Sequence, residues 1–585
     1  MNDVEKKNVE ELVWKIALQN AINHDGKAKT EPIIGRVLAE REDLRTRVTE
    51  LRQIVNEIVN RVNALSFSDQ KKVVEEHWPD LIVEEKIKTE EKKLAPLQNV
   101  ERHEFIHLRF APNPDGALHL GGSRAAILCD EYVKMYKGVY TLRYDDSDPR
   151  TKSPIPEAYD WIKEDLTWLG VKWHRVFHQS DPDRMESYYK VAKSLLERGF
   201  AYVCKCQIEE FRKLLIAGIP CPDRDLPPEV HLERWERMLD GTYGEKDAIV
   251  RIKTDLSHPN PAIRDWPILR VINTGKYPHP RTGDRFRVWP LFAYCCGVDD
   301  HDTKISHVLR GKEHIPNMIR ALYLYKHMNW ELSDMIHYGR LKITGTILSK
   351  SKIRAGIEQG IFTGWDDIRL GTLRALAKRG ILPETIRQLI VNFGIKGADA
   401  TVSWDNLYSY NRKLLDKKAD RYFFVSNPIT LTVDKIDKPY ISNQPFHPDY
   451  PERGFRTFKI NPSEGAAKFL VSKDDLPIFN TNNLVRLMGL FNIEIKEVVG
   501  DDVRAIFHSE PYEIAKKNGA PLIHWLPIGE GIKTNVIMPD NTIKSGLSEI
   551  SCSKLRRGDI PQFERFGFVR IDKVNDTITA YYAHK

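Results

Sequence analysis

The stretch from Leu108 to Gly138 decides the fold, and it begins Leu108-Arg-Phe-Ala-Pro-Asn-Pro-Asp-Gly-Ala-Leu-His-Leu-Gly-Gly122. The apolar residues Ile106, Leu108 and Phe110 predict a short buried strand. Two prolines and a glycine then predict a rigid turn, because proline fixes φ and glycine permits backbone angles that other residues avoid. A helical pattern follows. A strand, a glycine-rich turn and a helix start together predict an anion site, since free N–H groups and the helix dipole converge there.

His119 lies at the mouth of this predicted anion site, where an imidazole could contact a phosphate. The alternative is an ordinary strand-turn-helix in any α/β protein, with His119 merely capping the helix. The order Pro-x-Pro-x-Gly-x-x-His-x-Gly is more specific than a lone Gly-x-Gly. It resembles the first ATP signature of class I aminoacyl-tRNA synthetases, in the glutamyl/glutaminyl branch. One position departs: Gly122 stands where the family has a second histidine, so only His119 carries over.

The composition predicts a soluble, multi-domain protein. The chain has 585 residues, too many for one core, with 41% hydrophobic and 29% charged residues. No apolar run approaches the roughly 20 residues of a membrane span, and the first residues lack a signal-peptide layout. Seven cysteines without paired spacing predict reduced thiols and a cytoplasmic protein. A net charge of +7 is compatible with a nucleic-acid partner but does not decide it.

Residues 1–100 are predicted to be a helical extension. Apolar residues from Leu44 to Leu65 recur at helical spacing, and a packed hairpin is favoured over a coiled coil because only about three heptads are present. Glu84–Lys93 is predicted to be a solvated helix or linker. Gly26–Ala28 and Ile34–Leu38 resemble the N-terminal extension of archaeal glutamyl-tRNA synthetases.

Residues 101–200 alternate short apolar strands with amphipathic helices, which predicts a parallel sheet. The run Tyr140–Pro149 is a strand that ends in the carboxylates Asp145, Asp146 and Asp148. Ligands bind at the carboxyl ends of strands in such sheets. Asp148 equally suits a turn. Asp145 is the stronger functional candidate, because the resemblance implies an α-amino contact at that position.

Residues 201–288 are rich in proline and break the alternation, which predicts an inserted domain. It resembles the acceptor-stem-binding insertion of the family. Cys204, Cys206 and Cys221, with Asp223 or His231 as a fourth ligand, suggest zinc. Small buried thiols are the alternative, because only one closely spaced pair is present.

Residues 289–353 are predicted to be the second half of the sheet, with Trp289–His301 and then a strand that ends near Arg310. Arg109 and Arg310 could reach one cleft and hold carboxylates, although either alone would suit a surface salt bridge. Their match to the family's amino-acid pocket favours the functional interpretation. Phe292 stands where the family usually has tyrosine, so one expected hydroxyl is missing.

The segment Gly339–Ile353 contains Leu348-Ser-Lys-Ser351, a Lys/Ser pattern that is common in solvated turns. It resembles the second class I signature, Lys-Met-Ser-Lys-Ser, with Ile347 at the first lysine. Mobile cations there suit a departing pyrophosphate. The resemblance implies catalytic roles for His119 and Lys350. It implies ATP binding by Pro112, Asn113, Pro114, Asp115, Gly116, Ala117, Leu118, His119, Leu120, Gly121, Gly122, Ser349, Lys350 and Ser351, and substrate binding by Arg109, Asp145, Phe292 and Arg310.

The last third predicts a helical connector over residues 354–418, with helices at Asp366–Arg379 and Pro383–Phe393, and then β-structure over 419–585. In the β-region the apolar period changes to two, which predicts one or two barrels. In the family a β-barrel end is typical of archaeal and eukaryotic glutamyl enzymes and of glutaminyl enzymes, where it binds the anticodon.

The resemblance covers nearly the whole chain. It implies an α/β Rossmann-type catalytic domain with an inserted acceptor-binding domain, a helical N-terminal extension, a helical connector and C-terminal β-barrels. It further implies an archaeal-type glutamyl-tRNA synthetase, a monomer that uses ATP with Mg²⁺, L-glutamate and tRNA(Glu), with charging of tRNA(Gln) left open. A glutaminyl enzyme is the near alternative, but twin arginines favour a carboxylate side chain. A non-catalytic tRNA-binding protein and a small-metabolite nucleotidyltransferase are more distant alternatives.

Overall fold

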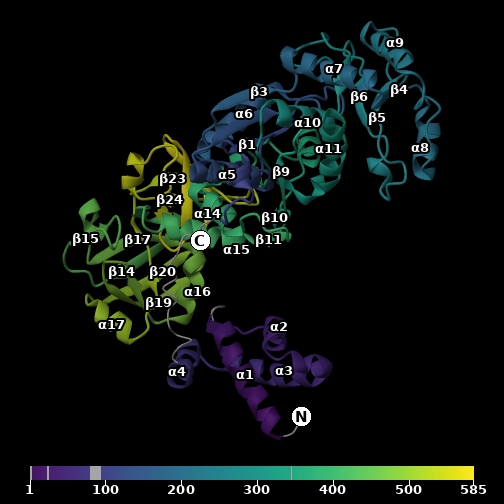
Figure 1. The fold of residues 1–585 in the computed structure, drawn as a ribbon. Helices are drawn as coiled ribbons and strands as arrows, with labels where there is room; N and C mark the ends of the chain where they lie inside the picture. Colours follow the sequence, from purple (N-terminus) through teal and green to yellow (C-terminus); the bar gives the residue numbers. More distant parts are fainter. Residues whose placement is uncertain (1–2, 23–25, 79–93, 344) are drawn as a thin grey trace. The chain divides into compact units, whose positions relative to one another are not determined.

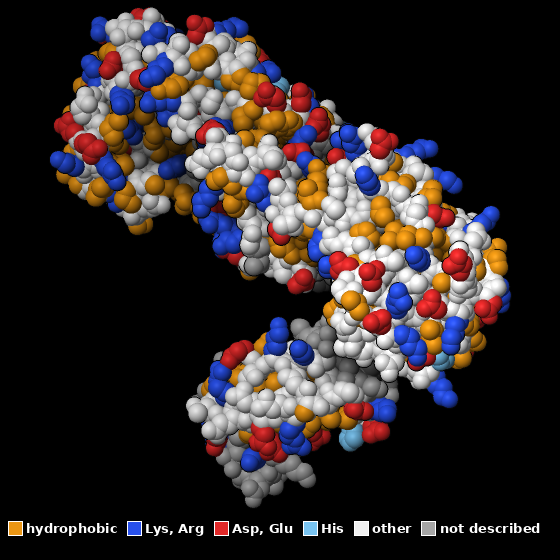
Figure 2. All heavy atoms as spheres, turned by 180° about the vertical axis from the view of Figure 1, so that it is seen from behind, with side chains coloured by type: hydrophobic (Ala, Val, Ile, Leu, Met, Phe, Trp, Pro, Cys, Tyr) orange, Lys and Arg blue, Asp and Glu red, His pale blue; other side chains and the backbone are white. Residues whose placement is uncertain are grey.

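The computed structural model describes residues 3–22, 26–78, 94–343 and 345–585, and Figure 1 shows the fold. It divides into two compact units, Met1–Lys93 and Leu94–Lys585. Among the described residues, no helix has the length and apolar character needed to cross a membrane. On the face shown in Figure 2, acidic and basic side chains are interspersed over most of the described surface.

The N-terminal unit is a packed helical bundle. Its core contains Val13, Leu51 and Val55, so the predicted helical packing is confirmed, but the described residues form four helices rather than a hairpin. Leu44 lies in a 3₁₀ turn, Glu42–Arg47, and the following helix begins only at Val48. The predicted charged run Glu84–Lys93 lies outside the described residues. The helices are α1 (Asp3–Ile22), α2 (Thr30–Glu40), α3 (Val48–Ala64) and α4 (Phe67–His77).

Parallel strands form the layer that carries the signature stretch. β1, β2 and β3 form one parallel sheet, and β8 and β9 form another. Ser306 N donates to His107 O at 3.0 Å, so β8 lies beside β1. The elements are β1 (His107–Phe110), α5 (Leu120–Tyr136), β2 (Val139–Tyr144), α6 (Pro156–Trp168), β3 (Arg175–His178), α7 (Pro182–Glu197), α10 (Phe292–Asp302), β8 (His307–Gly311), α11 (Ile315–Met328) and β9 (Asp334–Tyr338).

The proline-rich segment forms a separate antiparallel sheet of four strands. The prediction that Trp289–His301 begins the second half of the parallel layer is wrong. Trp289 and Pro290 pair with Arg270 and Leu269 in the antiparallel sheet, and the chain continues as helix α10. A continuously buried helix has the same apolar run as a buried strand. The elements are β4 (Ala201–Cys204), α8 (Ile208–Ala217), α9 (Pro228–Leu239), β5 (Ile249–Ile252), β6 (Pro267–Val271) and β7 (Val288–Pro290).

The connector is mainly helical, as predicted, but its second helix is shorter than Asp366–Arg379. It begins at Leu373, because Thr372 caps it by accepting a hydrogen bond from Ala375 N. Asp367 instead binds Arg369 within a turn. The elements are β10 (Leu341–Ile343), α12 (Lys350–Glu358), α13 (Leu373–Arg379), α14 (Pro383–Phe393), β11 (Ala400–Val402) and α15 (Trp404–Leu415).

The C-terminal region contains two sheets of seven strands each, ordered β12-β25-β26-β27-β23-β24-β13 and β21-β18-β19-β20-β14-β17-β22, plus the hairpin β15-β16. The predicted change to period two is confirmed, for example by the alternate burial along β14. The elements are β12 (Arg421–Tyr422), β13 (Phe424–Ser426), β14 (Pro428–Asp434), β15 (Tyr440–Pro445), β16 (Phe455–Ile460), β17 (Ala466–Ser472), α16 (Leu476–Thr481), β18 (Leu484–Leu487), β19 (Asn492–Val499), β20 (Asp502–Ser509), α17 (Tyr512–Lys517), β21 (Leu522–Ile523), β22 (Leu526–Pro527), β23 (Ile532–Ile537), β24 (Ile543–Ser548), β25 (Gln562–Phe563), β26 (Gly567–Val574) and β27 (Thr577–His584).

Candidate active site

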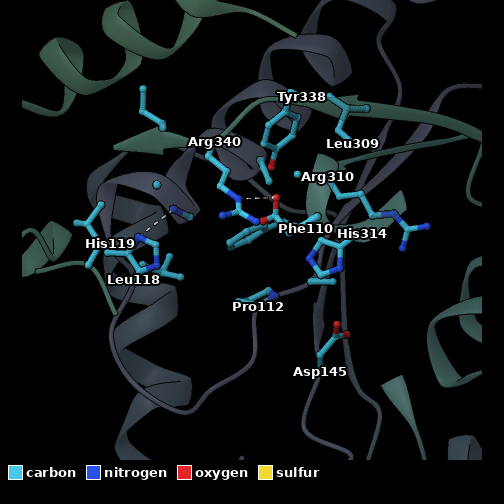
Figure 3. Close-up of a pocket in the computed structure, with 18 of the residues that line it drawn as sticks. Phe110, Pro112, Leu118, His119, Asp145, Leu309, Arg310, His314, Tyr338 and Arg340 are labelled. Atoms are coloured by element: carbon cyan, nitrogen blue, oxygen red, sulfur yellow. Dashed lines mark hydrogen bonds and ion pairs between the residues drawn. The ribbon is translucent and has the colours of Figure 1, made fainter. Parts of the chain in front are cut away.

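A cavity of about 690 Å³ lies at the carboxyl ends of β1, β2 and β8. Figure 3 shows His119 on one side of it and Arg310, His314 and Asp145 on the other. The cavity wall includes the predicted residues Arg109, Pro112, Leu118, His119, Gly121, Gly122, Asp145, Phe292, Arg310, Ser349 and Lys350. The predicted residues Asn113, Pro114, Asp115, Gly116, Ala117, Leu120 and Ser351 are not part of that wall.

His119 caps helix α5, which begins at Leu120. Its Nδ1 accepts a hydrogen bond from Gly122 N at 3.2 Å, so the proton of the neutral ring is on Nε2. Desolvation, and then the charge of Lys350, lower the pKa of His119 to about 4. The ring is therefore a neutral hydrogen-bond donor at pH 7. A Cβ added at Gly122 would meet only the His119 ring, at 3.9 Å, so this position has room for a side chain.

Lys350 joins the two signatures, which lie 235 residues apart. It is the first residue of α12, and its Nζ donates to Asn113 O at 2.7 Å and to Asp115 Oδ1 at 2.8 Å. Desolvation lowers the pKa of Lys350, although Asp115 opposes that shift. Gly116 is needed in the same turn, because a Cβ there would lie 2.2 Å from the Trp365 ring. The loop around the anion site is thus held in place by the second signature.

Arg109 is compensated within the protein. Its Nε and one terminal nitrogen donate to Asp300 at 3.1 and 3.3 Å, and Asp300 also accepts from Arg143 at 2.8 Å. Desolvation lowers the pKa of Arg109, but Asp300 outweighs it and the net shift is upward. Sequence reasoning missed Asp300 and Arg143. The available signal was the acidic pair Asp299-Asp300 in an otherwise apolar run.

Unlike Arg109, Arg310 has no carboxylate partner among the described residues. Within the same part of the chain, one of its terminal nitrogens lies 3.2 Å from Met335 Sδ, and its buried Nε has no hydrogen-bond partner. Desolvation, and then Arg109, lower the pKa of Arg310. A cation held this way is poised to bind a ligand carboxylate, because an unpaired buried charge is costly.

Asp145 and Phe292 complete this end of the cavity. Asp145 follows β2 and accepts from Arg143 Nε at 2.9 Å; desolvation raises its pKa, and Arg143 opposes the shift. Phe292 is the first residue of α10 and 40% exposed. Its ring centroid lies 5.5 Å from that of His314. Carboxylate, cation and aromatic side chains thus surround the space beside Arg310.

The cysteines predicted to bind zinc lie together. Cys221 Sγ is 3.5 Å from Cys204 Sγ and 3.1 Å from Cys206 Sγ, and all ligand atoms, including an oxygen of Asp223, lie within 4.8 Å of one another. Zn–S bonds of about 2.3 Å imply S···S edges of about 3.8 Å, so small shifts would suffice. The hydrogen bond with Cys221 lowers the pKa of Cys204 to about 6, which favours the thiolate. His231 is not in this set; its Nδ1 accepts from Val203 N.

The chain is similar to known families and proteins over almost all of its length. Residues 105–417 match the catalytic domain of class I tRNA synthetases (E and Q), and 419–510 and 522–572 match their anti-codon binding domains. The glutamate–tRNA ligases of Pyrococcus furiosus, Thermococcus kodakarensis and Methanocaldococcus jannaschii are 52%, 50% and 46% identical, over 99% of this chain and all of each relative. A solved glutamate tRNA ligase from Elizabethkingia meningosepticum aligns over 54% of this chain and 70% of its own, at 21% identity and a TM-score of 0.39, too low to support a statement about the site.

Proposed function

The chain belongs to the class I tRNA synthetases for glutamate and glutamine, and on that basis we propose that it is a glutamate–tRNA ligase. It activates L-glutamate with ATP and transfers the glutamyl group to the 3′ end of tRNA(Glu). The observation that carries the proposal is the cavity itself. The two signatures meet at one side of the cavity through Lys350. Arg310, which forms no ion pair with a carboxylate of the described residues, lies at the other side.

In the first step, an α-carboxylate oxygen of glutamate attacks the α-phosphorus of ATP. The bond from that phosphorus to the oxygen of pyrophosphate breaks, and pyrophosphate leaves with the electron pair. His119 Nε2–H and the N-terminus of α5 face the phosphates. Lys350 exchanges its contact with Asp115 for the charge that develops on pyrophosphate.

At the other side, Asp145 receives the α-ammonium group of glutamate, and Arg310 receives the side-chain carboxylate. Arg109, which Asp300 holds in position, adds a second positive charge near that carboxylate.

In the second step a ribose hydroxyl of the terminal tRNA adenosine attacks the activated acyl carbon. The acyl–phosphate bond breaks, AMP leaves, and the hydroxyl proton is released to the departing phosphate or to water.

The domain roles follow the order of the chain. Residues 101–200 and 291–353 form a Rossmann-type catalytic domain, 201–290, which include β7, form the insertion that binds the acceptor stem, and 419–585 bind the anticodon. β-Surfaces suit this last role, because they can stack and read single-stranded bases. Substituting anticodon bases in tRNA(Glu) should therefore slow charging by the intact chain. The intact chain is the right material, since β27 packs on the connector through Arg379 and Ala583 O at 3.3 Å.

Two metals fit the proposal in different ways. The cavity's carboxylates are engaged: Asp145 binds Arg143, and Glu313 lies 3.5 Å from Arg340. Mg²⁺ would therefore enter bound to ATP oxygens and water rather than in a protein cage.

A structural zinc ion would suit Cys204, Cys206, Cys221 and Asp223, and it would stabilise the 201–288 segment. Metal analysis of the purified protein, before and after a chelator, tests the zinc.

The decisive experiment charges purified tRNA(Glu) and tRNA(Gln) with glutamate and with glutamine. We expect glutamate on tRNA(Glu); glutamate on tRNA(Gln) would extend the range, and glutamine on tRNA(Gln) alone would replace the proposal with a glutaminyl enzyme. Arg310 favours glutamate, because a half-buried, desolvated guanidinium binds a carboxylate far better than an amide.

A further inference from the structure

His314 lies in the cavity wall beside Arg310, and the steps above give it no role. It ends the 3₁₀ turn Lys312–His314 and directly precedes α11. Its imidazole is part of a chain of contacts that leads away from the cavity along α11.

The hydrogen bonds along this chain of contacts determine which atom of each side chain donates and which accepts. Arg320 Nε and one terminal nitrogen donate to Ala262 O at 3.0 and 2.7 Å, and its other terminal nitrogen donates to Asn317 Oδ1 at 3.1 Å. Arginine has no acceptor atom, so the atom of Asn317 that faces Arg320 must be the amide oxygen. The amide nitrogen of Asn317 therefore faces His314 Nδ1, at 3.1 Å.

This arrangement selects one tautomer of His314. An amide N–H can only donate, so Nδ1 accepts and the ring proton is on Nε2. Desolvation, and then the charge of Arg310, lower the pKa of His314 to about 4, so the ring is neutral at pH 7. His314 therefore offers a fixed donor at Nε2, and its side chain lies beside that of Arg310 in the cavity wall (Figure 3), whose guanidinium can only donate.

Two neighbouring groups that can only donate hydrogen bonds distinguish a carboxylate from an amide. Both oxygens of a carboxylate can accept from them, whereas the NH₂ of an amide would face a donor and leave a buried group unpaired. We propose that His314 is a specificity-determining residue whose Nε2–H donates to the side-chain carboxylate of the acidic substrate beside Arg310, and that Asn317 and Arg320 are positioning residues. This inference rests on the proposed function. The competing explanation is that His314 only packs against Phe292.

The test uses the full-length protein with tRNA(Glu) and measures pyrophosphate exchange driven by glutamate and by glutamine. His314→Phe keeps an aromatic ring but removes the donor. We expect the KM for glutamate to rise about tenfold to a hundredfold, with a smaller change in kcat and a weaker preference for glutamate over glutamine. His314→Gln restores a donor and an acceptor together, so it should recover much of the glutamate KM but less of the preference.

The positioning residues are tested on the same helix. Arg320→Met frees the Asn317 amide to turn and should change the KM for glutamate in the same direction as His314→Phe, by a smaller factor. Lys326→Met is the matched control, because Lys326 is an exposed cation of α11, and it should leave the KM unchanged. A second readout needs no turnover: in ¹⁵N-histidine-labelled protein, the signals that His314→Gln removes should show an unprotonated Nδ1 and a protonated Nε2.

The outcomes separate the two proposals. If the wild-type protein gives no glutamate-dependent exchange, the proposed function is wrong and the inference falls with it. If the wild type is active but His314→Phe keeps its KM and its preference, the inference alone is wrong. A protonated Nδ1 on His314 in the wild-type spectrum would also overturn it, even if the variants fold poorly.

Discussion

The two ends of the cavity are built differently. At the end that we propose binds the phosphates of ATP (the phosphate end), two short stretches of sequence meet, and the contacts involve backbone atoms: His119 with Gly122 N, and Lys350 with Asn113 O. At the amino-acid end, side chains from β1, β2, α10 and β8 converge, and each charge depends on which other charge lies beside it. At the phosphate end, the identity of each residue is therefore enough to predict its contacts. At the amino-acid end it is not enough, because Arg109 is paired with a carboxylate and Arg310, in the same wall, is not.

The largest effect on stability should come from one of these two arginines, Arg109. Arg109→Leu removes a partner of buried Asp300, and breaking such a pair typically costs about 3–5 kcal/mol. Because Asp300 keeps its bond to Arg143, we expect a loss toward the lower end of that range, together with poorer glutamate use. Urea unfolding and glutamate kinetics measure the two effects.

Arg310→Leu is the matched comparison. It breaks no ion pair among the described residues, so the free energy of unfolding should stay the same or rise while the KM for glutamate increases by about tenfold to a hundredfold. If Arg310→Leu destabilises the fold as much as Arg109→Leu, the contrast between the two arginines is wrong. Near-normal glutamate charging by either variant would place that arginine outside the substrate contacts.

At the phosphate end, Lys350→Ala should slow adenylate formation and hardly change the KM for glutamate. A cation that meets charge only as pyrophosphate departs stabilises the transition state selectively, and loss of such a group costs about 2.7–4 kcal/mol. Lys352→Ala is the control, since Lys352 is exposed on the same helix. A change confined to the Michaelis constant would contradict the role given to Lys350.

His119→Ala should reduce the activation rate by about a hundredfold or more, the cost of losing one preorganised hydrogen-bond donor. Because the pKa of His119 is lowered to about 4, the ring stays neutral above about pH 5, and its titration should not shape the rate between pH 5 and 8. A loss of rate below pH 6.5 that disappears in His119→Ala would contradict this.

Gly122→His, combined with His119→Ala, probes the departure from the family motif. A Cβ at Gly122 meets only the His119 ring, at 3.9 Å, and Gly122 lines the cavity, so we expect a new imidazole to enter the cavity and recover part of the rate. A double variant no better than His119→Ala would show that the second imidazole position no longer faces the phosphates.

Sequence reasoning selected both signature stretches of this cavity because their information is local. A turn of prolines and glycine, a capping histidine and a Lys/Ser run each lie within a few residues, and the structure brings His119, Ser349 and Lys350 to one cavity. The same reasoning selected Arg109, Asp145 and Arg310, which the structure places in the wall of that cavity, but it could not show that Asp300 compensates Arg109. That pairing joins residues 191 positions apart and depends on α10 being a helix.

The misplaced α10 shows why. Its eleven residues are almost continuously buried, so no polar face reveals the helical period. The run was therefore assigned to the sheet, and Asp299 and Asp300 passed as a strand end. Similarly, Asp366–Thr372 was predicted to begin a helix, yet the side-chain bonds of Asp367 hold it as a turn. Tertiary burial and side-chain capping, rather than propensity, set both boundaries.

The smallest effect should come from Phe292→Tyr, which adds the hydroxyl that the family usually carries at the amino-acid end. Phe292 is 40% exposed at the rim, so water competes for a new hydroxyl, and the gain should not exceed the net value of one hydrogen bond, about 0.5–1.5 kcal/mol. We expect a lower KM for glutamate by a factor of a few, with kcat unchanged. Phe292→Leu is the control: it removes the ring that packs on His314, and if His314 is held by Asn317 rather than by that ring, the preference for glutamate over glutamine should survive. A preference lost in Phe292→Leu would instead assign the orientation of His314 to aromatic packing. Specificity at the amino-acid end would then depend on the packing of aromatic rings, whereas the residues of the phosphate end are positioned by contacts with backbone atoms.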